Sequence, residues 1–432
     1  MSFKSLIFII CISLLAACQS TSEQAGTAQE KAKDEEVTLR FYSYNLGNAA
    51  HGTGTQMLID EFMKEHPNIN IEGVPVPIAE VNSRIHADVV AGNSPDIAQM
   101  GFNAADSIVN EMKAIPLESI ASEKELEEHF EGFSPNAVNL GKLNGQTYGL
   151  PFTISTPVLF YNASLFKQAG LDPNQPPKNW GEVKEYALAI KDATDASGIQ
   201  IASDSYDWII QALIASNGGQ VVSDNRKEVT FGSDEAIESI KMWQDLVQSG
   251  AHSKMTYEEA KEAMFQGKIG MFLLSSAVQS TLIDSAESGG WELRSAEMPG
   301  FGEQQSRPTN SGSGLFVLSD DPVKQKAAWE FMKFVTSERG YTIITSEIGY
   351  LPLRPEIVKD PEYLQEWAEK NPLIQPNLNQ LERLTPWTSY PGENYSNIEK
   401  ILVEAVRKAT FTDGDVKKIM QDAQLRAQDL VK

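Results

Sequence analysis

Aromatic side chains stand at several places where the sequence predicts a loop or the end of a strand. Tyr44 ends a β-rich run, Trp208 follows a polar turn, and Tyr350 lies in a Gly-Tyr-Leu-Pro segment. Trp387 and Tyr390 belong to a Pro-rich loop. A single such ring most often closes the edge of a core, but it can also present a flat apolar face to a ligand. Sugar rings suit such faces, so the recurrence of aromatic residues at strand ends indicates a partly aromatic cleft.

Catalytic motifs are absent from the sequence. None of the five histidines has a partner at metal-ligand spacing on one helix, and Glu65-His66 lacks the second histidine of H-E-x-x-H. Ser313 has no glycine two positions before it, which a nucleophile elbow requires. No phosphate-binding loop occurs either. We therefore expect no enzyme, no metal and no cofactor, although 59 acidic residues leave a chance glycosidase pair open.

The two cysteines lie near the N-terminus. Residues 1–17 carry one cation and a short apolar run that ends in small residues, as in a signal peptide. Leu15-Ala16-Ala17-Cys18 resembles a bacterial lipobox, which predicts that Cys18 carries a diacylglyceryl anchor; an ordinary secretory signal is the alternative. Residues 19–36 contain no aliphatic residue larger than alanine, so residues 18–36 are expected to form a flexible tether. The exported domain would then contain no disulfide.

The chain has 432 residues and a formal charge of −23, with 36 basic against 59 acidic residues. No basic cluster offsets this balance, so unaided binding to nucleic acid is not expected. The length allows two or three cores. An acidic surface fits a soluble domain outside the cell.

A β-α-β-α-β order opens the domain. Alternating or apolar runs predict strands, and apolar stripes at helical spacing predict helices, over residues 37–44, 55–65, 69–76, 81–91 and 96–100. This order predicts a parallel sheet whose ligands lie at the carboxyl ends of the strands.

Strand-like segments recur later in the chain. They are expected at 148–152, 157–161, 269–274 and 315–318, among helices that include two amphipathic ones at the C-terminus. Ser233, a Thr256–Glu259 capping box and Asp321 mark helix starts. We expect two α/β lobes: residues 37–149 plus 309–348, and residues 150–308 plus 349–432.

Three segments carry a family resemblance: residues 150–180, Ala91 to Asp96, and Gly349 to Pro352. They resemble the family 1 extracellular solute-binding proteins of ABC importers. The resemblance implies a two-lobed, type II periplasmic-binding-protein-like α/β fold, each lobe a mainly parallel sheet flanked by helices. It also implies a ligand cleft between the lobes, hinge closure and delivery to a membrane permease.

Within the family, the members that bind glycerol 3-phosphate are the most similar that we recognise. Counterparts of their ligand residues are Ser155, Ser275 or Ser276, Gly312 and Tyr350. A tyrosine, a glutamate and an arginine of those members align with Ile78, Phe102 and Pro391. Losing the arginine and the carboxylate favours a neutral sugar over glycerol phosphate. Arg354 or Arg383 could still supply a phosphate contact, which keeps that alternative open.

These observations predict a monomeric carrier of extracellular carbohydrate that is held at the cell membrane, facing the periplasm or the outside, by lipid on Cys18. Its partners would be the sugar and the permease subunits of an ABC importer, with no nucleic acid. A lipid-anchored carbohydrate-processing enzyme is the alternative from another class. The expected ligand-binding residues are Tyr44, Asn45, Asn103, Ser155, Trp208, Ser275, Gly312, Tyr350, Trp387 and Tyr390.

Overall fold

A five-stranded sheet forms the centre of the first lobe. The computed structural model describes residues 36–202 and 206–431. The strand order of the sheet is β2-β1-β3-β11-β6, with β1 parallel to β2 and β3, and β11 antiparallel to β3 and β6. The bounds are β1 Val37–Ser43, β2 Ile69–Pro75, β3 Ile97–Met100, β6 Gly149–Ser155 and β11 Ser311–Val317. The parallel pairing that the β-α-β-α-β order predicts is confirmed for β1, β2 and β3.

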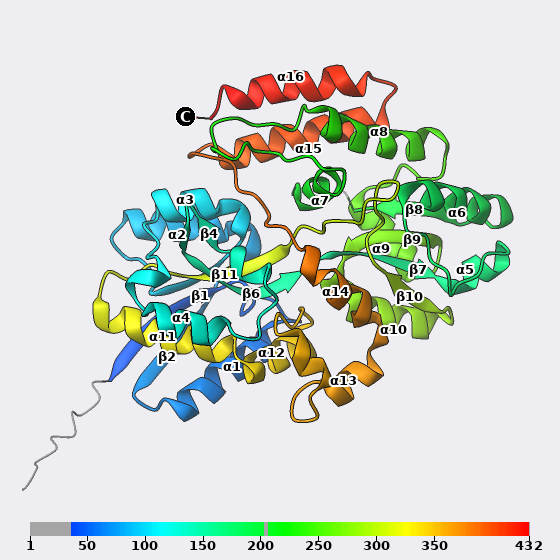
Figure 1. The fold of residues 1–432 in the computed structure, drawn as a ribbon. Coiled ribbons are helices and arrows are strands. Elements are labelled where there is room, and N and C mark those ends of the chain that lie inside the picture. Colours follow the sequence, from blue (N-terminus) through cyan, green and yellow to red (C-terminus); the bar gives the residue numbers. More distant parts are fainter. Residues whose placement is uncertain (1–35, 203–205, 432) are drawn as a thin grey trace, which may run out of the picture. The chain divides into compact units, whose positions relative to one another are not determined.

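Helices cover both faces of this sheet. Figure 1 shows α2 and α3 on one side and α1 and α11 on the other. Phe331 of α11 packs edge-on against Phe41 of β1 at 5.4 Å and against Phe62 of α1 at 5.1 Å between ring centroids. The bounds are α1 Gly52–Glu65, α2 Val81–Val90, α3 Ala105–Asn110, α4 Glu123–Phe130, α11 Pro322–Val335 and α12 Glu338–Ile343. A small hairpin joins β4 Lys142–Leu143 to β5 Gln146–Thr147.

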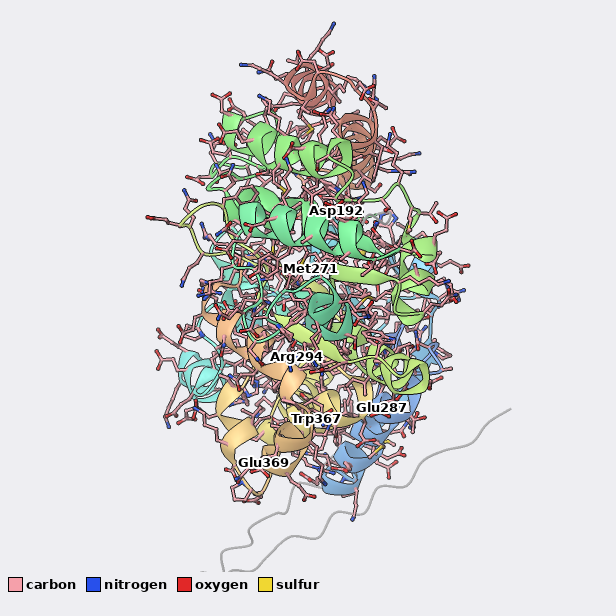
Figure 2. All side chains as sticks on the ribbon, turned by 90° about the vertical axis from the view of Figure 1, so that its right-hand side faces the viewer. Asp192, Met271, Glu287, Arg294, Trp367 and Glu369 are labelled. Atoms are coloured by element: carbon pink, nitrogen blue, oxygen red, sulfur yellow. The ribbon has the colours of Figure 1, made fainter. Side chains whose placement is uncertain are left out.

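The second lobe has a four-stranded sheet of order β10-β7-β9-β8. One of its two inner strands, β9, is an unbroken apolar run up to Leu274, as expected for a strand buried on both faces. Figure 2 labels Asp192 on α6, Met271 on β9 and Arg294 on β10. The bounds are β7 Pro157–Asn162, β8 Ser197–Ile201, β9 Ile269–Ser275, β10 Leu293–Ala296, α5 Ala163–Gln168, α6 Trp180–Ala193, α9 Tyr257–Phe265 and α10 Gln279–Gly289.

Four further helices extend the second lobe, and Figure 1 shows α8, α15 and α16 together beyond α7. Their bounds are α7 Trp208–Ser216, α8 Asp234–Gln248, α15 Tyr395–Phe411 and α16 Val416–Gln428. The expected helix starts are confirmed. Ser233 accepts a bond from Ala236 N at 3.3 Å, and Thr256 with Glu259 forms a capping box. Asp321 caps α11.

The sheets are mixed rather than mainly parallel. β9 is antiparallel to β7 and parallel to β8, and β10 is antiparallel to β7. β11 runs antiparallel to both of its neighbours in the first sheet. The reversal follows from topology, because β6, β7 and β11 lie where the chain crosses between lobes instead of following a β-α-β crossover.

Two separate apolar cores show where the chain passes from one lobe to the other. The first core includes residues up to Ile154 and again from Leu315 to Leu384, and the second core includes residues from Val158 to Met298 and from Trp387 onward. The expected lobe boundaries differ at two places. Residues 150–155 pair with β11, and residues 350–384 pack against the first core. We therefore propose lobe boundaries near residues 156, 309 and 385.

Between the later crossings lie α13 Gln365–Lys370 and α14 Gln375–Gln380. No helix in the described part of the chain is long and apolar enough to cross a membrane. The predicted signal peptide, Cys18 and all but the last residue of the predicted tether lie outside the described residues.

Candidate functional site

Tyr44 directly follows β1 and lies against a buried polar network. Gln99 accepts a bond from Ser43 Oγ at 2.6 Å and donates from Nε2 to Thr153 Oγ1 at 3.1 Å and Ser313 Oγ at 2.9 Å. Burial raises the pKa of the Tyr44 hydroxyl, and bonds to Ser313, Thr153 and Gln99 partly oppose that rise. Four strands thus fix one tyrosine at the end of the first sheet.

Two asparagines stand at the same edge of the sheet. Asn45 is fully buried, and neither atom of its side-chain amide has a partner among the described residues. Asn103 follows β3, is also buried, and donates from Nδ2 to Glu399 Oε2 of α15 at 3.3 Å. An unpaired buried polar group costs about 1–3 kcal/mol, and both amide atoms of Asn45 are of this kind among the described residues.

The serines predicted from the family resemblance meet where the two sheets approach each other. Ser275 Oγ, at the end of β9, donates to Ser155 Oγ, at the end of β6, at 3.0 Å. Gly312 lies on β11 with φ of +97°, and a Cβ there would lie 1.8 Å from Thr153 O. The position therefore admits only glycine, and its observed role is to let β11 and β6 approach closely.

The aromatic residues divide between two environments. The rings of Trp387 and Tyr206 are edge-on at 5.8 Å, and Tyr350 is edge-on to His51 at 5.4 Å. Trp208, Trp387 and Tyr390 all belong to the second apolar core, and Tyr350 belongs to the first. Their contact with a ligand stays a prediction, and the structure gives them packing roles.

Asp207 accepts hydrogen bonds from side chains of the loop that carries Trp387 and Tyr390, which we call the aromatic loop. Trp387 Nε1 donates to its Oδ1 at 2.7 Å, and Tyr390 OH and Gln211 Nε2 donate to its Oδ2 at 2.6 and 2.9 Å. Glu399 lies beside it, accepting from Asp207 N at 3.4 Å. Burial raises the pKa of both carboxyl groups. Because three side-chain donors stabilise the charged form of Asp207, we assign the proton of this pair to Glu399.

A cavity of about 470 Å³ opens beside Tyr350 and takes residues from both lobes. This interlobe cavity is lined by the loop before α1, the residues after β9, the turn at 345–351 and the α13 region. Glu347 is the one charged side chain among the described residues that line it. Its polar and aromatic lining consists of Asn48, His51, Ser276, Gln279, Ser280, Thr281, Thr345, Ser346, Tyr350, Trp367 and Asn371.

The cavity contains residues that the sequence did not single out as ligand contacts. His51 Nδ1, Gln279 Oε1 and Thr345 Oγ1 are buried and lack partners in the described part of the chain. Burial lowers the pKa of His51, which keeps the ring neutral at pH 7. His51 had one signal in the sequence, its position in the loop after the first strand. Gln279 and Thr345 had none, because their proximity arises only from tertiary packing.

Neither late arginine lines the interlobe cavity. Arg354 is buried and donates to Thr336 O, Glu131 O and His129 O, and also to Glu338. The expectation that it could contact a phosphate in the cleft is therefore not supported, since its donors are engaged within the first lobe.

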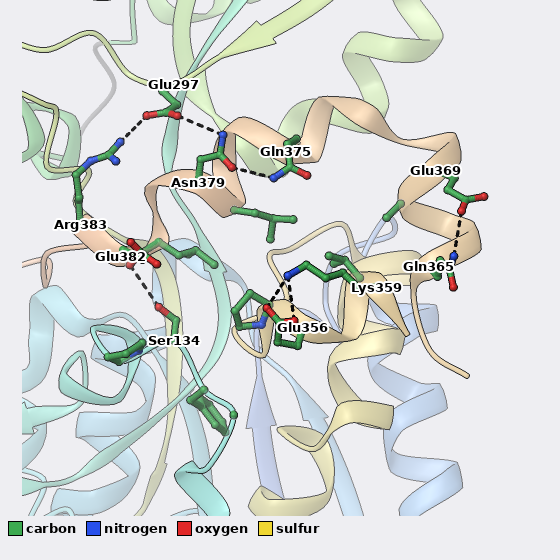
Figure 3. A pocket seen from close by; sticks show the side chains of 18 residues that line it. Ser134, Glu297, Glu356, Lys359, Gln365, Glu369, Gln375, Asn379, Glu382 and Arg383 are labelled. Atoms are coloured by element: carbon green, nitrogen blue, oxygen red, sulfur yellow. Dashed lines mark hydrogen bonds and ion pairs between the residues drawn. The ribbon is translucent and has the colours of Figure 1, made fainter. Parts of the chain in front are cut away.

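Arg383 lies at a different groove. It pairs with Glu297 Oε2 at 2.5 Å and donates to Ser306 O at 2.9 Å. Figure 3 shows it turned toward Glu297 at the side of a separate groove of about 1020 Å³ that also carries Ser134 and Lys359. Its guanidinium is thus engaged at this separate groove, and Arg383 is not among the residues that line the interlobe cavity. The described residues contain no cluster of three or more His, Cys, Asp or Glu suited to a metal ion.

Comparison with known proteins gives consistent results. The glycerol-3-phosphate-binding periplasmic protein UgpB of Pectobacterium atrosepticum is 27% identical over 371 residues, covering 81% of each chain. UgpB of Escherichia coli K12 is 27% identical over 387 residues, covering 85% of each chain.

Solved structures share the fold. The cyclic α-maltosyl-1,6-maltose-binding protein of Arthrobacter globiformis matches with a TM-score of 0.78 and 20% identity, over 91% of this chain and 98% of its own. UgpB of Mycobacterium tuberculosis, solved with glycerophosphocholine, matches with a TM-score of 0.77 and 18% identity, over the same shares. The two-lobed α/β fold of periplasmic binding proteins is thereby confirmed. The bacterial extracellular solute-binding protein family matches residues 47–342, and the chain belongs to this family.

Proposed function

We propose that the protein captures an extracellular carbohydrate in the interlobe cavity and delivers it to the permease of an ABC importer. The observation that carries this proposal is the chemistry of the cavity wall: uncharged polar groups, three aromatic or heteroaromatic rings, and no lysine or arginine among the described lining residues. Hydroxyl-rich neutral molecules suit such a wall. A phosphate dianion would instead favour a guanidinium or ammonium group.

Glycerol 3-phosphate or its diesters remain the second candidate, because the curated relatives named above bind glycerol 3-phosphate. Two observations weigh against it. Phe102, where those relatives are expected to have a glutamate, is buried and packs edge-on to Phe316 at 6.0 Å. Arg354 and Arg383 are engaged elsewhere.

A thermal-shift experiment tests the choice. Full-length protein in detergent is heated with maltose, maltotetraose or glycerol 3-phosphate, and we expect a saccharide to raise the melting temperature. Ligand at a hundred times its dissociation constant adds ~2.7 kcal/mol of stability. Stabilisation by glycerol 3-phosphate at lower concentration than by any saccharide would contradict the proposal. Conversion of the bound saccharide to product would favour an enzyme instead.

We further propose that lipid on Cys18 anchors the protein to the membrane, facing outward. The support is the Leu-Ala-Ala-Cys sequence at the end of the predicted signal. Replacing Cys18 by alanine should move the protein from the membrane fraction to the soluble fraction of the envelope or to the medium. A membrane-bound Cys18→Ala protein would argue against the anchor.

A further inference from the structure

We propose that Gln279, Thr345 and His51 form a hydroxyl-recognition subsite that joins the two lobes through the solute. The inference rests on the proposed function, because it names the atoms of the interlobe cavity that would contact the carbohydrate. None of the three residues belongs to the family pattern recognised in the sequence.

The first step is the burial of unused polar atoms. Gln279 is 8% exposed and Thr345 is 1% exposed. Their Oε1 and Oγ1 atoms, together with His51 Nδ1, have no hydrogen-bond partner in the described part of the chain. All three residues line one cavity. Buried polar groups in folded proteins are paired with few exceptions, so three orphans around one space indicate that a guest supplies the missing partners.

The second step is how the fold brings these atoms together. His51 precedes α1; its carbonyl accepts from Thr55 N at 3.1 Å, but its side chain makes no capping bond. Thr345 lies in a π-helical turn, Ile344–Ile348, of the kind often found at functional sites. At Gly54 of α1, a Cβ would lie 2.6 Å from Ile348 Cγ1, so helix and turn are in close contact. This contact holds His51 and Thr345 on the first lobe.

The third residue belongs to the other lobe. Gln279 begins α10, directly after β9 and its short 3-10 turn. A solute that bonds to Gln279 on one side and to Thr345 or His51 on the other therefore contacts both lobes. Such shared contacts are stronger when the lobes are closed, which is how a bound solute favours closure.

The fourth step is the chemistry of the guest. A glutamine Oε1 only accepts, a threonine hydroxyl donates and accepts, and a neutral imidazole Nδ1 does one or the other. Burial lowers the pKa of His51, so the ring is neutral at pH 7. Saccharide hydroxyls both donate and accept and can satisfy all three. A phosphate dianion only accepts, so it would leave Gln279 Oε1 unpaired and would share the cavity with Glu347.

The test uses substitutions that keep shape and remove the polar atom. Gln279→Met and Thr345→Val are made in the full-length protein, and affinities for maltose, maltotetraose and glycerol 3-phosphate are measured by calorimetry. Because the replaced atoms have no partner in the ligand-free protein, its melting temperature should stay unchanged or rise. Affinity for the saccharide that binds the parent protein should fall about tenfold in each variant.

A matched control is Thr410→Val. Thr410 is as buried as Thr345, but its hydroxyl donates to Val406 O at 2.8 Å within α15. This control should leave saccharide affinity unchanged. If the two variants bind the saccharide as well as the parent does, or if they melt at lower temperature without ligand, the inference is wrong while the proposed function stands. If no saccharide binds the parent protein, the proposed function fails and the inference falls with it.

Discussion

The buried carboxyl pair shows how a single proton supports the aromatic loop. Asp207 receives hydrogen bonds from Trp387, Tyr390 and Gln211, whereas Glu399 has only weaker contacts with Asn103 Nδ2 and Asp207 N. Two neighbouring carboxyl groups in an apolar surrounding repel each other when both are charged. Glu399 is therefore the neutral, protonated member of the pair, so that the charged Asp207 has no second negative charge beside it.

A pH-dependent stability follows from this arrangement. Burial and the charge of Asp207 raise the pKa of Glu399 above its ordinary value of 4.5. The unfolded chain releases this proton first as pH rises. The stability that the proton contributes is therefore complete below about pH 4.5. It is lost as the pH rises from there toward the raised pKa, by about 1.4 kcal/mol per pH unit.

Glu399→Gln should remove this dependence, because the amide is a permanent neutral substitute for the protonated acid. Chemical denaturation at pH 5, 7 and 9 should show the parent losing more stability than the variant as pH rises, with the variant the more stable of the two at pH 9. If the free energy of unfolding changes with pH in the same way in both proteins, Glu399 does not carry the proton of the pair.

At the scale of elements, one contact joins α3 of the first lobe to two loops of the second. Asp106 Oδ2 accepts from Arg226 Nη2 at 2.9 Å, and Asp106 Oδ1 accepts from Gly392 N at 2.9 Å. Arg226 also donates to Ser389 O at 3.1 Å. Both charged side chains are largely shielded from solvent, at 10% and 23% exposure, so the pair is stronger than an exposed one.

Asp106→Asn should loosen this interlobe contact, because it removes the charge while keeping a side chain that can still accept from Gly392 N. With this contact weakened, a smaller fraction of the molecules is in the closed form. This lowers the apparent affinity of a solute that binds the closed form. We expect a larger radius of gyration in solution scattering without ligand, and saccharide affinity weakened by roughly threefold to tenfold, or ~1 kcal/mol. Asp245→Asn is the control, since its ion pair with Lys184 lies within one lobe. Equal effects of both changes would show that the contact does not govern closure.

The elements themselves were largely predictable, while their pairing was not. The runs that became β1, β2, β3 and β9 were visible as alternating or apolar segments, and helix starts such as Ser233 carried local signals. The position of β11 between β3 and β6 depends on contacts between segments more than 150 residues apart. No local pattern encodes such a contact.

The candidate site shows the same division. Tyr44, Asn45 and Tyr350 were expected because strand ends and a family motif mark them. Gln279 and Thr345, which we propose as ligand contacts, have no signal in the sequence, because only the packing of α10 and of the π-helical turn brings them to one cavity.

At the scale of the whole molecule, α14 is bonded both to the first crossing between the lobes and to the core of the second lobe. Gln380 is fully buried; its Nε2 donates to Pro157 O at 2.9 Å and Thr156 Oγ1 at 3.2 Å, and its Oε1 accepts from Met298 N at 3.0 Å. Thr156 also donates to Asn377 Oδ1 at 2.9 Å. Gln380 thus ties α14 to the first crossing and to Met298 of the second core, and so holds segments about which the lobes would rotate.

Gln380→Ala should therefore change both stability and closure. Three hydrogen bonds are lost and buried backbone groups lose their partner, which should lower the free energy of unfolding by roughly 2–4 kcal/mol. Gln244→Ala is the matched control, because Gln244 Nε2 donates to three backbone carbonyls, of Ala409, Thr412 and Gly414, all within the second lobe. Denaturation should show both variants to be less stable than the parent. Solution scattering with and without saccharide should show an altered open-to-closed change only for Gln380→Ala, because of the two residues only Gln380 holds segments that must move relative to each other. The same alteration in both variants would place the hinge elsewhere.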